Sequence, residues 1–291
     1  MSTELSIINQ DELNDFIART RVSSEDLQGG GDFLPQLKIN YLDEIDVNGV
    51  KKEAKPGLFT LSGQEVQSFA KNVVFRPLLH NFQYIKYNDV EKKVTNRSVF
   101  FTSFSEEARD ESGTVRCGKP QSKTLKDNPV LKKQFEDVTL YRSVDGLVSY
   151  DGVDFDGKLV KVENVLCSYR GKGSNFSPFQ EEYIKLMPKG TLIWDFDLKL
   201  GVTKHKQDPK SAATYYVVHF EADFAEKLQF TSELFETVKA LQVRINETNL
   251  EIDKKYYAAV EARNELSSDV AAANAVDVTP LSTDMEDDSP F

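Results

Sequence analysis

The feature that most constrains the fold is a series of short apolar runs, separated by tight-turn residues, between Phe33 and Phe220. The runs are rich in Val, Ile, Phe and Tyr, which are the residue types that β-strands favour. Asn, Asp and Gly separate several of them, and these residues adopt the positive φ values that tight hairpin turns need. The pattern therefore predicts antiparallel hairpins rather than alternating β-α-β units.

The turn signals and the strands between them define one mainly β domain over residues 32–225. The turn signals are Asp46-Val47-Asn48-Gly49, Asn88-Asp89, Asp145-Gly146, Asp151-Gly152 and Asp156-Gly157. The predicted strands are Leu37–Tyr41, Gly57–Leu61, Val73–His80, Phe82–Tyr87, Ser98–Phe104, Leu140–Ser143, Leu147–Tyr150, Leu159–Tyr169, Thr191–Gly201 and Thr214–Glu221. We expect appended helices on either side of this domain.

After Thr231 the spacing of the apolar residues becomes that of a helix. Leu234, Val238, Leu241 and Ile245 recur at intervals of three and four, with charged residues between them. One long amphipathic helix is predicted within residues 226–266. The pattern leaves open whether this helix packs on the β domain or pairs with a second copy of the chain.

The two ends of the chain differ from its centre. Residues 1–31 hold a predicted short helix over 11–21, followed by Gly29-Gly30-Gly31, which has no side chains to pack and marks a flexible joint. Residues 267–291 are small, polar and acidic, so they cannot bury enough apolar surface to order themselves. They form a predicted disordered acidic tail.

Charge is unevenly distributed along the chain. The net charge is −11, yet residues 71–133 hold thirteen Lys or Arg against seven acidic residues. This basic region is interleaved with aromatic residues, and single-strand nucleic-acid binders need that pairing of cations for phosphates with rings for bases. The strand Phe82–Tyr87 is the best candidate platform, because alternation puts Phe82, Tyr84 and Lys86 on one face.

The candidate nucleic-acid-binding residues lie in three segments. They are Arg76, Phe82, Tyr84, Lys86, Lys92, Lys93 and Arg97 in the basic region, Arg170 and Lys172 in a Gly-rich loop, and Lys204 and Lys206 in a third segment. The glycines of the second segment do not follow the patterns of nucleotide triphosphate sites.

The tail combines consecutive acidic residues with an aromatic residue. An aromatic ring can fill a small apolar pocket while carboxylates engage Lys or Arg around its rim, which gives a weak, reversible tether to a partner. The candidate partner-binding residues are Asp284, Glu286, Asp287, Asp288, Pro290 and Phe291.

The segment Glu286-Asp287-Asp288-Ser289-Pro290-Phe291 resembles the acidic Pro-Phe tip of bacterial single-stranded DNA-binding proteins. The layout of β domain, helix and acidic tail is closer to that of phage-type single-stranded DNA-binding proteins. The resemblance implies an oligonucleotide-binding (OB) type barrel with insertions. It further implies roles in DNA replication, recombination and repair, with polymerase, helicase or primase recruited through the tail.

Other functional classes lack support in the sequence. No run approaches the length of a membrane span, and the first residues lack the pattern of a signal peptide, so we expect a cytoplasmic protein, in the host cell if phage-encoded. Cys117 and Cys167 are far apart and the three histidines are scattered. We therefore expect no metal site, no cofactor and no enzyme activity.

Two alternatives remain open. In the first, the chain is a structural or assembly protein, a homo-oligomer whose long helix associates and whose tail serves solubility. In the second, it is a Mg²⁺-dependent nuclease that uses the aspartate pairs Asp154/Asp156 or Asp195/Asp197.

Overall fold

The computed structural model describes residues 34–47, 49–88, 90–91, 93–113, 126–135, 138–206 and 214–269. The predicted N-terminal helix and residues 270–291 of the predicted acidic tail lie outside these ranges, as does Lys92, whereas residues 267–269 of that tail are helical. None of the described helices combines the length and the hydropathy that crossing a membrane requires.

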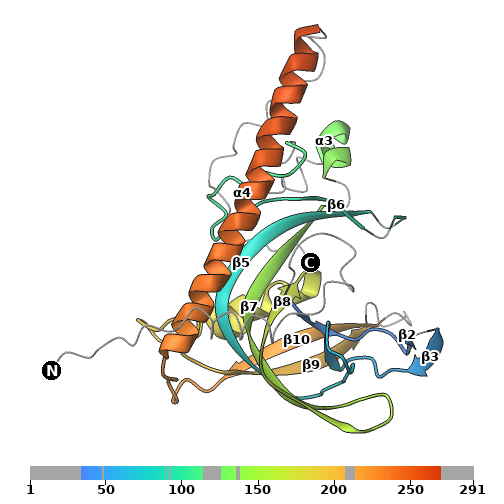
Figure 1. The fold of residues 1–291 in the computed structure, drawn as a ribbon, viewed down its shortest axis with the longest axis vertical. Helices are drawn as coiled ribbons and strands as arrows, with labels where there is room; N and C mark the ends of the chain where they lie inside the picture. Colours follow the sequence, from blue (N-terminus) through green and yellow to red (C-terminus); the bar gives the residue numbers. More distant parts are fainter. Residues whose placement is uncertain are drawn as a thin grey trace, which may run out of the picture. The chain divides into compact units, whose positions relative to one another are not determined.

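The described chain is mainly β with a long C-terminal helix, as the sequence predicts (Figure 1). The strands are β1 (Gln36–Ile39), β2 (Glu44–Val47), β3 (Val50–Glu53), β4 (Phe59–Leu61), β5 (Val73–Asn88), β6 (Lys93–Arg97), β7 (Val138–Val153), β8 (Leu159–Gly171), β9 (Leu198–Lys206) and β10 (Thr214–Ala222). The helices are α3 (Pro129–Gln134), the 3-10 helix η1 (Gly173–Asn175), the π-helix η2 (Phe179–Ile184) and α4 (Ser232–Asp269).

The main sheet has the strand order β10-β9-β5-β7-β8-β1-β4, with β6 added beside β5. Every pair whose register is resolved is antiparallel except β1 with β8, where Gln36 faces Ser168. Two isolated bridges, Phe59 to Ala70 and Phe69 to Val153, lead from β4 back to β7. The sheet is not closed into a barrel, because its end strands β10 and β4 do not pair within the described residues.

Two predicted hairpin turns are wrong, because β7 runs without a break through both Asp145-Gly146 and Asp151-Gly152. Gly146 meets a packing requirement instead of a turn requirement. A Cβ added there would lie 2.2 Å from the carbonyl oxygen of Arg76 and 2.7 Å from the ring of Phe75. Glycine inside a strand often marks such a close approach of backbone.

The other turn signals are confirmed where the structure describes them. Gly49, at φ 81°, stands between β2 and β3, and Gly157, at φ 78°, stands between β7 and β8. Four more of the predicted strands differ from the structure. Val73–His80 and Phe82–Tyr87 are one strand, β5; Ser98–Phe104 makes only isolated bridges; and Thr191–Gly201 enters the sheet only at Leu198.

The described chain forms two compact units, and β5, β7 and β8 each contribute residues to both. Unit 1 comprises the described residues up to Arg76, with Gly146–Tyr169 and Asp197–Ala222. Its core consists of inward-facing strand residues, of which Phe59, Phe75, Cys167, Leu198 and Val218 are fully buried.

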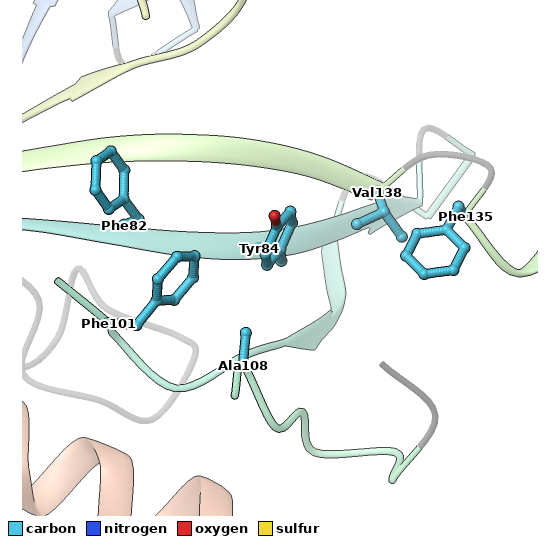
Figure 2. Close-up of a cluster of buried hydrophobic side chains, with 6 residues drawn as sticks. All are labelled: Phe82, Tyr84, Phe101, Ala108, Phe135 and Val138. Atoms are coloured by element: carbon cyan, nitrogen blue, oxygen red, sulfur yellow. The ribbon is translucent and has the colours of Figure 1, made fainter. Parts of the chain in front are cut away.

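Unit 2 comprises the described residues within Pro77–Asp145, Arg170–Phe196 and Asp223–Asp269. One of its apolar clusters holds Phe82, Tyr84, Phe101, Ala108, Phe135 and Val138 (Figure 2). Figure 2 shows Phe82 and Tyr84 on one strand, with the ring of Phe101 close to them.

Helix α4 packs on its own chain within unit 2, which is one of the two arrangements that the sequence left open. Its predicted apolar face is buried, from Leu234 to Tyr256. The amide of Asn249 bonds both backbone groups of Phe100, at 2.7 and 2.9 Å. The Arg109 guanidinium donates to both carboxylate oxygens of Asp253, at 2.7 and 2.9 Å.

Candidate functional site

The end of the β9–β10 hairpin next to the connection between its two strands places basic and aromatic side chains directly opposite one another. The register pairs Lys204 with Tyr216 and His205 with Tyr215. Because successive strand residues point to opposite faces, Lys204 and Tyr216 share one face of the hairpin, while His205 and Tyr215 share the other. Each face of this hairpin end therefore carries a nitrogen-bearing side chain beside a ring.

On the first face a second tyrosine joins the pair. The ring of Tyr41, which follows β1, meets the Tyr216 ring edge-on at a centroid distance of 5.7 Å. The Lys204 ammonium lies 5.9 Å from the Tyr216 ring. Tyr216 is buried beneath its neighbours, whereas 53% of Tyr41 is exposed, so Tyr41 presents the accessible ring.

The backbone around Tyr41 is fixed by hydrogen bonds from Asn40. The side-chain amide of this buried residue donates to the Leu42 carbonyl at 2.8 Å, and its oxygen accepts from the Leu42 N–H at 3.1 Å. The backbone of Asn40 also bonds Gly57 and Leu58, both at 2.8 Å. The segment that carries Tyr41 is thereby held next to β4.

Gly57 lets this segment approach Tyr216. It adopts φ 84°, and a Cβ there would lie 2.7 Å from the Tyr216 ring. Any other residue at this position would both strain the backbone and displace the ring on which Tyr41 rests.

On the second face the rings of His205 and Tyr215 are stacked. Their centroids are 5.3 Å apart and their planes differ by 18°. Both residues are exposed, so the outer side of this stack is open to a further planar group. Offset stacking of this kind is the arrangement that aromatic pairs prefer.

The lysines at this hairpin end are exposed. No carboxylate among the described residues forms an ion pair with Lys204 or Lys206, whereas Lys51, on another hairpin of unit 1, pairs with Glu44. We call Tyr41, Lys204, His205, Lys206, Tyr215 and Tyr216 the hairpin site.

The two rings of the predicted stacking platform on β5 are buried. Phe82 and Tyr84 are each 5% exposed, and both belong to the cluster in Figure 2. The sequence interpretation assigned one face of this strand to solvent, but Gln83 and Ile85 on the opposite face are buried as well. A base could not stack on Phe82 or Tyr84 unless their neighbours moved first.

Several predicted cations are already engaged in unit 2. Arg97 pairs with Glu111 at 3.1 Å, and Lys93 pairs with Glu91 at 2.9 Å. Arg170 is half-buried, and burial lowers the pKa of its guanidinium despite the nearby carboxylate of Asp145. The prediction that Arg170 contacts phosphates directly is therefore not favoured.

The remaining predicted cations are accessible to different degrees. Lys86 is half-buried, and exposed Lys172 lies 5.5 Å from the ring of Tyr141. Arg76 is half-buried and lies near Asp197. Desolvation raises the pKa of the Asp197 carboxyl group, and the charge of Arg76 partly offsets that rise. Only Lys204 and Lys206 of the predicted set lie in the hairpin site.

Unit 1 also contains a hollow of about 780 Å³, which is less suited than the hairpin site to binding a polyanion. Lys71, Lys161 and Lys199 line it, but so do Asp151, Glu163 and Glu221. Lys161 is moreover bound to Glu163 at 2.6 Å. The charges of this hollow balance one another.

The aspartate pairs of the nuclease alternative have local partners. The Asp154 carboxylate accepts the N–H groups of Asp156 and Lys158, which shapes the β7–β8 turn. Asp195 binds Lys227 at 2.9 Å. Among the described residues no three His, Cys, Asp or Glu side chains gather as a metal site would require.

The sequence interpretation missed Tyr41, Tyr215 and Tyr216, and it placed Lys204, His205 and Lys206 in a loop, whereas they belong to β9. Tyr215 and Tyr216 carry a usable signal, since these two adjacent tyrosines on one predicted strand follow the Lys-His-Lys run that extends the strand before it. A hairpin register applied to those two strands would have paired them. The contribution of Tyr41 has no local signal, because it depends on contact with a distant strand.

Comparison of the chain with family models, with curated proteins and with solved structures gives no match.

Proposed function

We propose that this protein binds single-stranded DNA through the hairpin site. The observation that carries the proposal is the cross-strand pairing of Lys204 with Tyr216 and of His205 with Tyr215. Stacking on an exposed ring stabilises a bound base by roughly 1–3 kcal/mol, and nearby cations attract the phosphates that link successive bases. The site supplies both kinds of contact within a few residues.

The chemistry of the site favours a single strand over a duplex. Rings can stack on bases only where those bases are unpaired and splayed out. The site also lacks a helix that could enter a major groove, since its members lie on β9, β10 and the segment after β1. Binding is expected to be largely independent of sequence, because every base has a face that can stack.

We further propose that unit 1 is an open form of the OB-type barrel. Side chains approach one another near the two ends of the sheet path, where Tyr216 of β10 touches Tyr41 and Gly57. The ring of Tyr169 on β8 also meets Phe220 of β10 at 5.5 Å. OB folds are partly open barrels whose binding face lies on strands and adjacent loops.

The roles in replication, recombination and repair rest on the acidic tail. We propose that Asp284, Glu286, Asp287, Asp288, Pro290 and Phe291 recruit replication proteins such as a polymerase, helicase or primase. The assembly alternative stays a second proposal: one apolar face of α4 is buried within its own unit, but Val243, Leu250 and Tyr257 of the same helix are exposed.

The test is a titration of fluorescently labelled oligo-dT with the full chain at two salt concentrations. We expect binding that weakens steeply with salt, because phosphate neutralisation releases counterions. The double variant Lys204→Glu/Lys206→Glu is expected to lose about tenfold or more in affinity and to show a shallower salt dependence.

The matched control is Lys93→Glu, which reverses a lysine that the sequence predicted but that already pairs with Glu91. Its affinity should stay close to that of the unchanged protein. Equal losses in both variants would show that binding does not depend on the hairpin site. Absence of binding at low salt, with the tail acids neutralised, would overturn the proposed function.

A further inference from the structure

A second candidate binding surface lies in unit 2, where the first turns of α4 meet the segment between η2 and β9. An apolar groove of about 450 Å³ opens there. Trp194, Phe230 and Phe235 form its wall, and Leu192 lies at its edge. The groove belongs to neither the hairpin site nor the sheet.

The groove is preformed. Trp194 and Phe230 are stacked, with centroids 5.0 Å apart and planes at 27°. The buried carboxylate of Asp195 accepts the Leu192 N–H at 2.8 Å and binds Lys227 at 2.9 Å. The Asp195 carbonyl also accepts the Leu228 N–H at 2.8 Å. These bonds tie together the two segments that supply the ring pair.

Three apolar side chains of the groove are exposed, and Trp194 is half-buried. Phe235 is 54% exposed, Leu192 is 52% exposed and Phe230 is 38% exposed. Contiguous apolar side chains of this size rarely stay open to water without a partner. An aromatic side chain has the shape and chemistry to cover them.

Two lysines border the groove. The side chain of Lys227 is 59% exposed and that of Lys239 is 62% exposed. Their nearest carboxylates are Asp195, which is buried, and Glu236, which is 4.0 Å from Lys239. Both ammonium groups can therefore still meet an incoming carboxylate. The groove fits a peptide that carries one aromatic residue next to several acids.

We propose that the occupant is the segment Asp284–Phe291 of the same chain. This segment has one aromatic residue, Phe291, and four acidic residues: Asp284, Glu286, Asp287 and Asp288. Phe291 packs against the Trp194–Phe230 pair, and the acids face Lys227 and Lys239. The segment is thereby held until a binding partner competes for it.

The chain is long enough for this contact. Gln242, at the groove, is 27 residues before the last described residue of α4, so the helix runs about 40 Å beyond the groove at 1.5 Å per residue. The 15 residues from Asp269 to Asp284 span up to about 50 Å when extended. The segment can therefore return along α4 to the groove.

Trp194 provides the measurement, because it is the single tryptophan of the protein. Acrylamide quenching of its fluorescence reports how accessible the groove is in the full chain. We expect Phe291→Ser, and separately the neutralised variant Asp287→Asn/Asp288→Asn, to increase quenching. A synthetic peptide of residues 284–291 should then protect Trp194 in the Phe291→Ser chain. Adding Phe235→Ser to that chain should lower the affinity for the peptide by about tenfold or more.

A charge exchange tests the rim directly. Lys239→Glu should increase quenching, and Lys239→Glu combined with Asp288→Lys should restore protection. The matched control is Phe291→Ser in a Phe235→Ser background, where it should cause no further increase in quenching. Equal quenching in the unchanged and Phe291→Ser chains would overturn the proposal. Protection that disappears on dilution would assign the contact to a second copy and overturn it too.

The contact stands apart from nucleic-acid binding. It is measured without DNA, so a failure of the hairpin site in the oligo-dT titration leaves its result unaffected, and the reverse also holds.

Discussion

The guanidinium of Arg142 lies 4.7 Å from the ring centroid of Phe176, and its Nε donates to the Phe176 carbonyl at 2.8 Å. The same group faces the ring of Phe82 at 4.9 Å. Its Nη1 is 2.9 Å from Nε2 of His80 and donates to Gln180 at 3.2 Å. One buried side chain thus connects β7 to β5 and to the segment that carries η1 and η2.

Replacing Arg142 with Lys should destabilise the protein. Lysine keeps the charge but cannot stack between two rings or donate in several fixed directions, so Arg and Lys are not equivalent here. We expect the free energy of unfolding to fall by about 2–4 kcal/mol, measured by urea denaturation. The control is Lys172→Arg, a change at an exposed cation, which should leave stability nearly unchanged.

Stability should fall as the pH drops below neutral, because of His80. Burial, and secondarily the charge of Arg142, lowers the pKa of His80 from 6.5 to about 3. The unfolded chain therefore takes up a proton below pH 6.5 that the folded chain refuses until about pH 3. The stability that neutral His80 provides is complete above pH 6.5 and is lost as the pH falls through this window.

At pH 5 this loss should amount to about 2 kcal/mol relative to pH 7.5. Urea denaturation at the two pH values measures it. In the variant His80→Gln, the free energy of unfolding should differ less between these two pH values, whatever its absolute value. If the difference is the same in both proteins, other groups cause the pH dependence.

Two glycines with similar φ values allow the contact between position 57 and the Tyr216 ring to be tested against backbone strain alone. Gly57→Ala meets both backbone strain and the Tyr216 ring, whereas Gly49→Ala, at φ 81°, meets backbone strain alone. We expect Gly49→Ala to cost about 1 kcal/mol and Gly57→Ala about 1–3 kcal/mol more. Thermal unfolding compares the two. Equal costs would show that the ring accommodates the added methyl group freely.

Each exposed ring of the hairpin site should stabilise a bound oligonucleotide by stacking on one base. Tyr41→Ala and Tyr215→Ala are each expected to weaken oligo-dT binding by about 1–3 kcal/mol, with little change in salt dependence. Phe104→Ala serves as the control, because Phe104 is also exposed, at 41%, but lies in unit 2. A loss in the Phe104 variant as large as in the other two would assign stacking to unit 2.

The β class and the long helix could be predicted because their signals are local. Gly49 and Gly157 sit where positive φ is required, and the spacing from Leu234 to Tyr256 follows one helix face. The continuity of β7 could not be predicted, because Asp145-Gly146 has the composition of a turn. The close approach of the distant Arg76 carbonyl and Phe75 ring explains why a glycine stands there within a strand.

The candidate site was only partly predictable for the same reason. Lys204 and Lys206 stand out in the sequence as exposed hairpin cations, and the structure exposes them. Phe82 and Tyr84 have the same composition signal as a stacking platform, but long-range packing with Phe101 and Phe135 buries them. Alternation shows which side chains share a face and does not show which face is covered.

The parallel pairing of β1 with β8 has a consequence for the biosynthesis of the protein. Gln36 pairs with Ser168, so this contact closes a loop of about 130 residues. During translation, β1 leaves the ribosome long before β8 exists, and β10 follows later still. Strand β1 can pair with β4 soon after both are made, but its other edge stays without its partner until β8 has been synthesised, and unit 1 can complete its sheet only after β10 has followed.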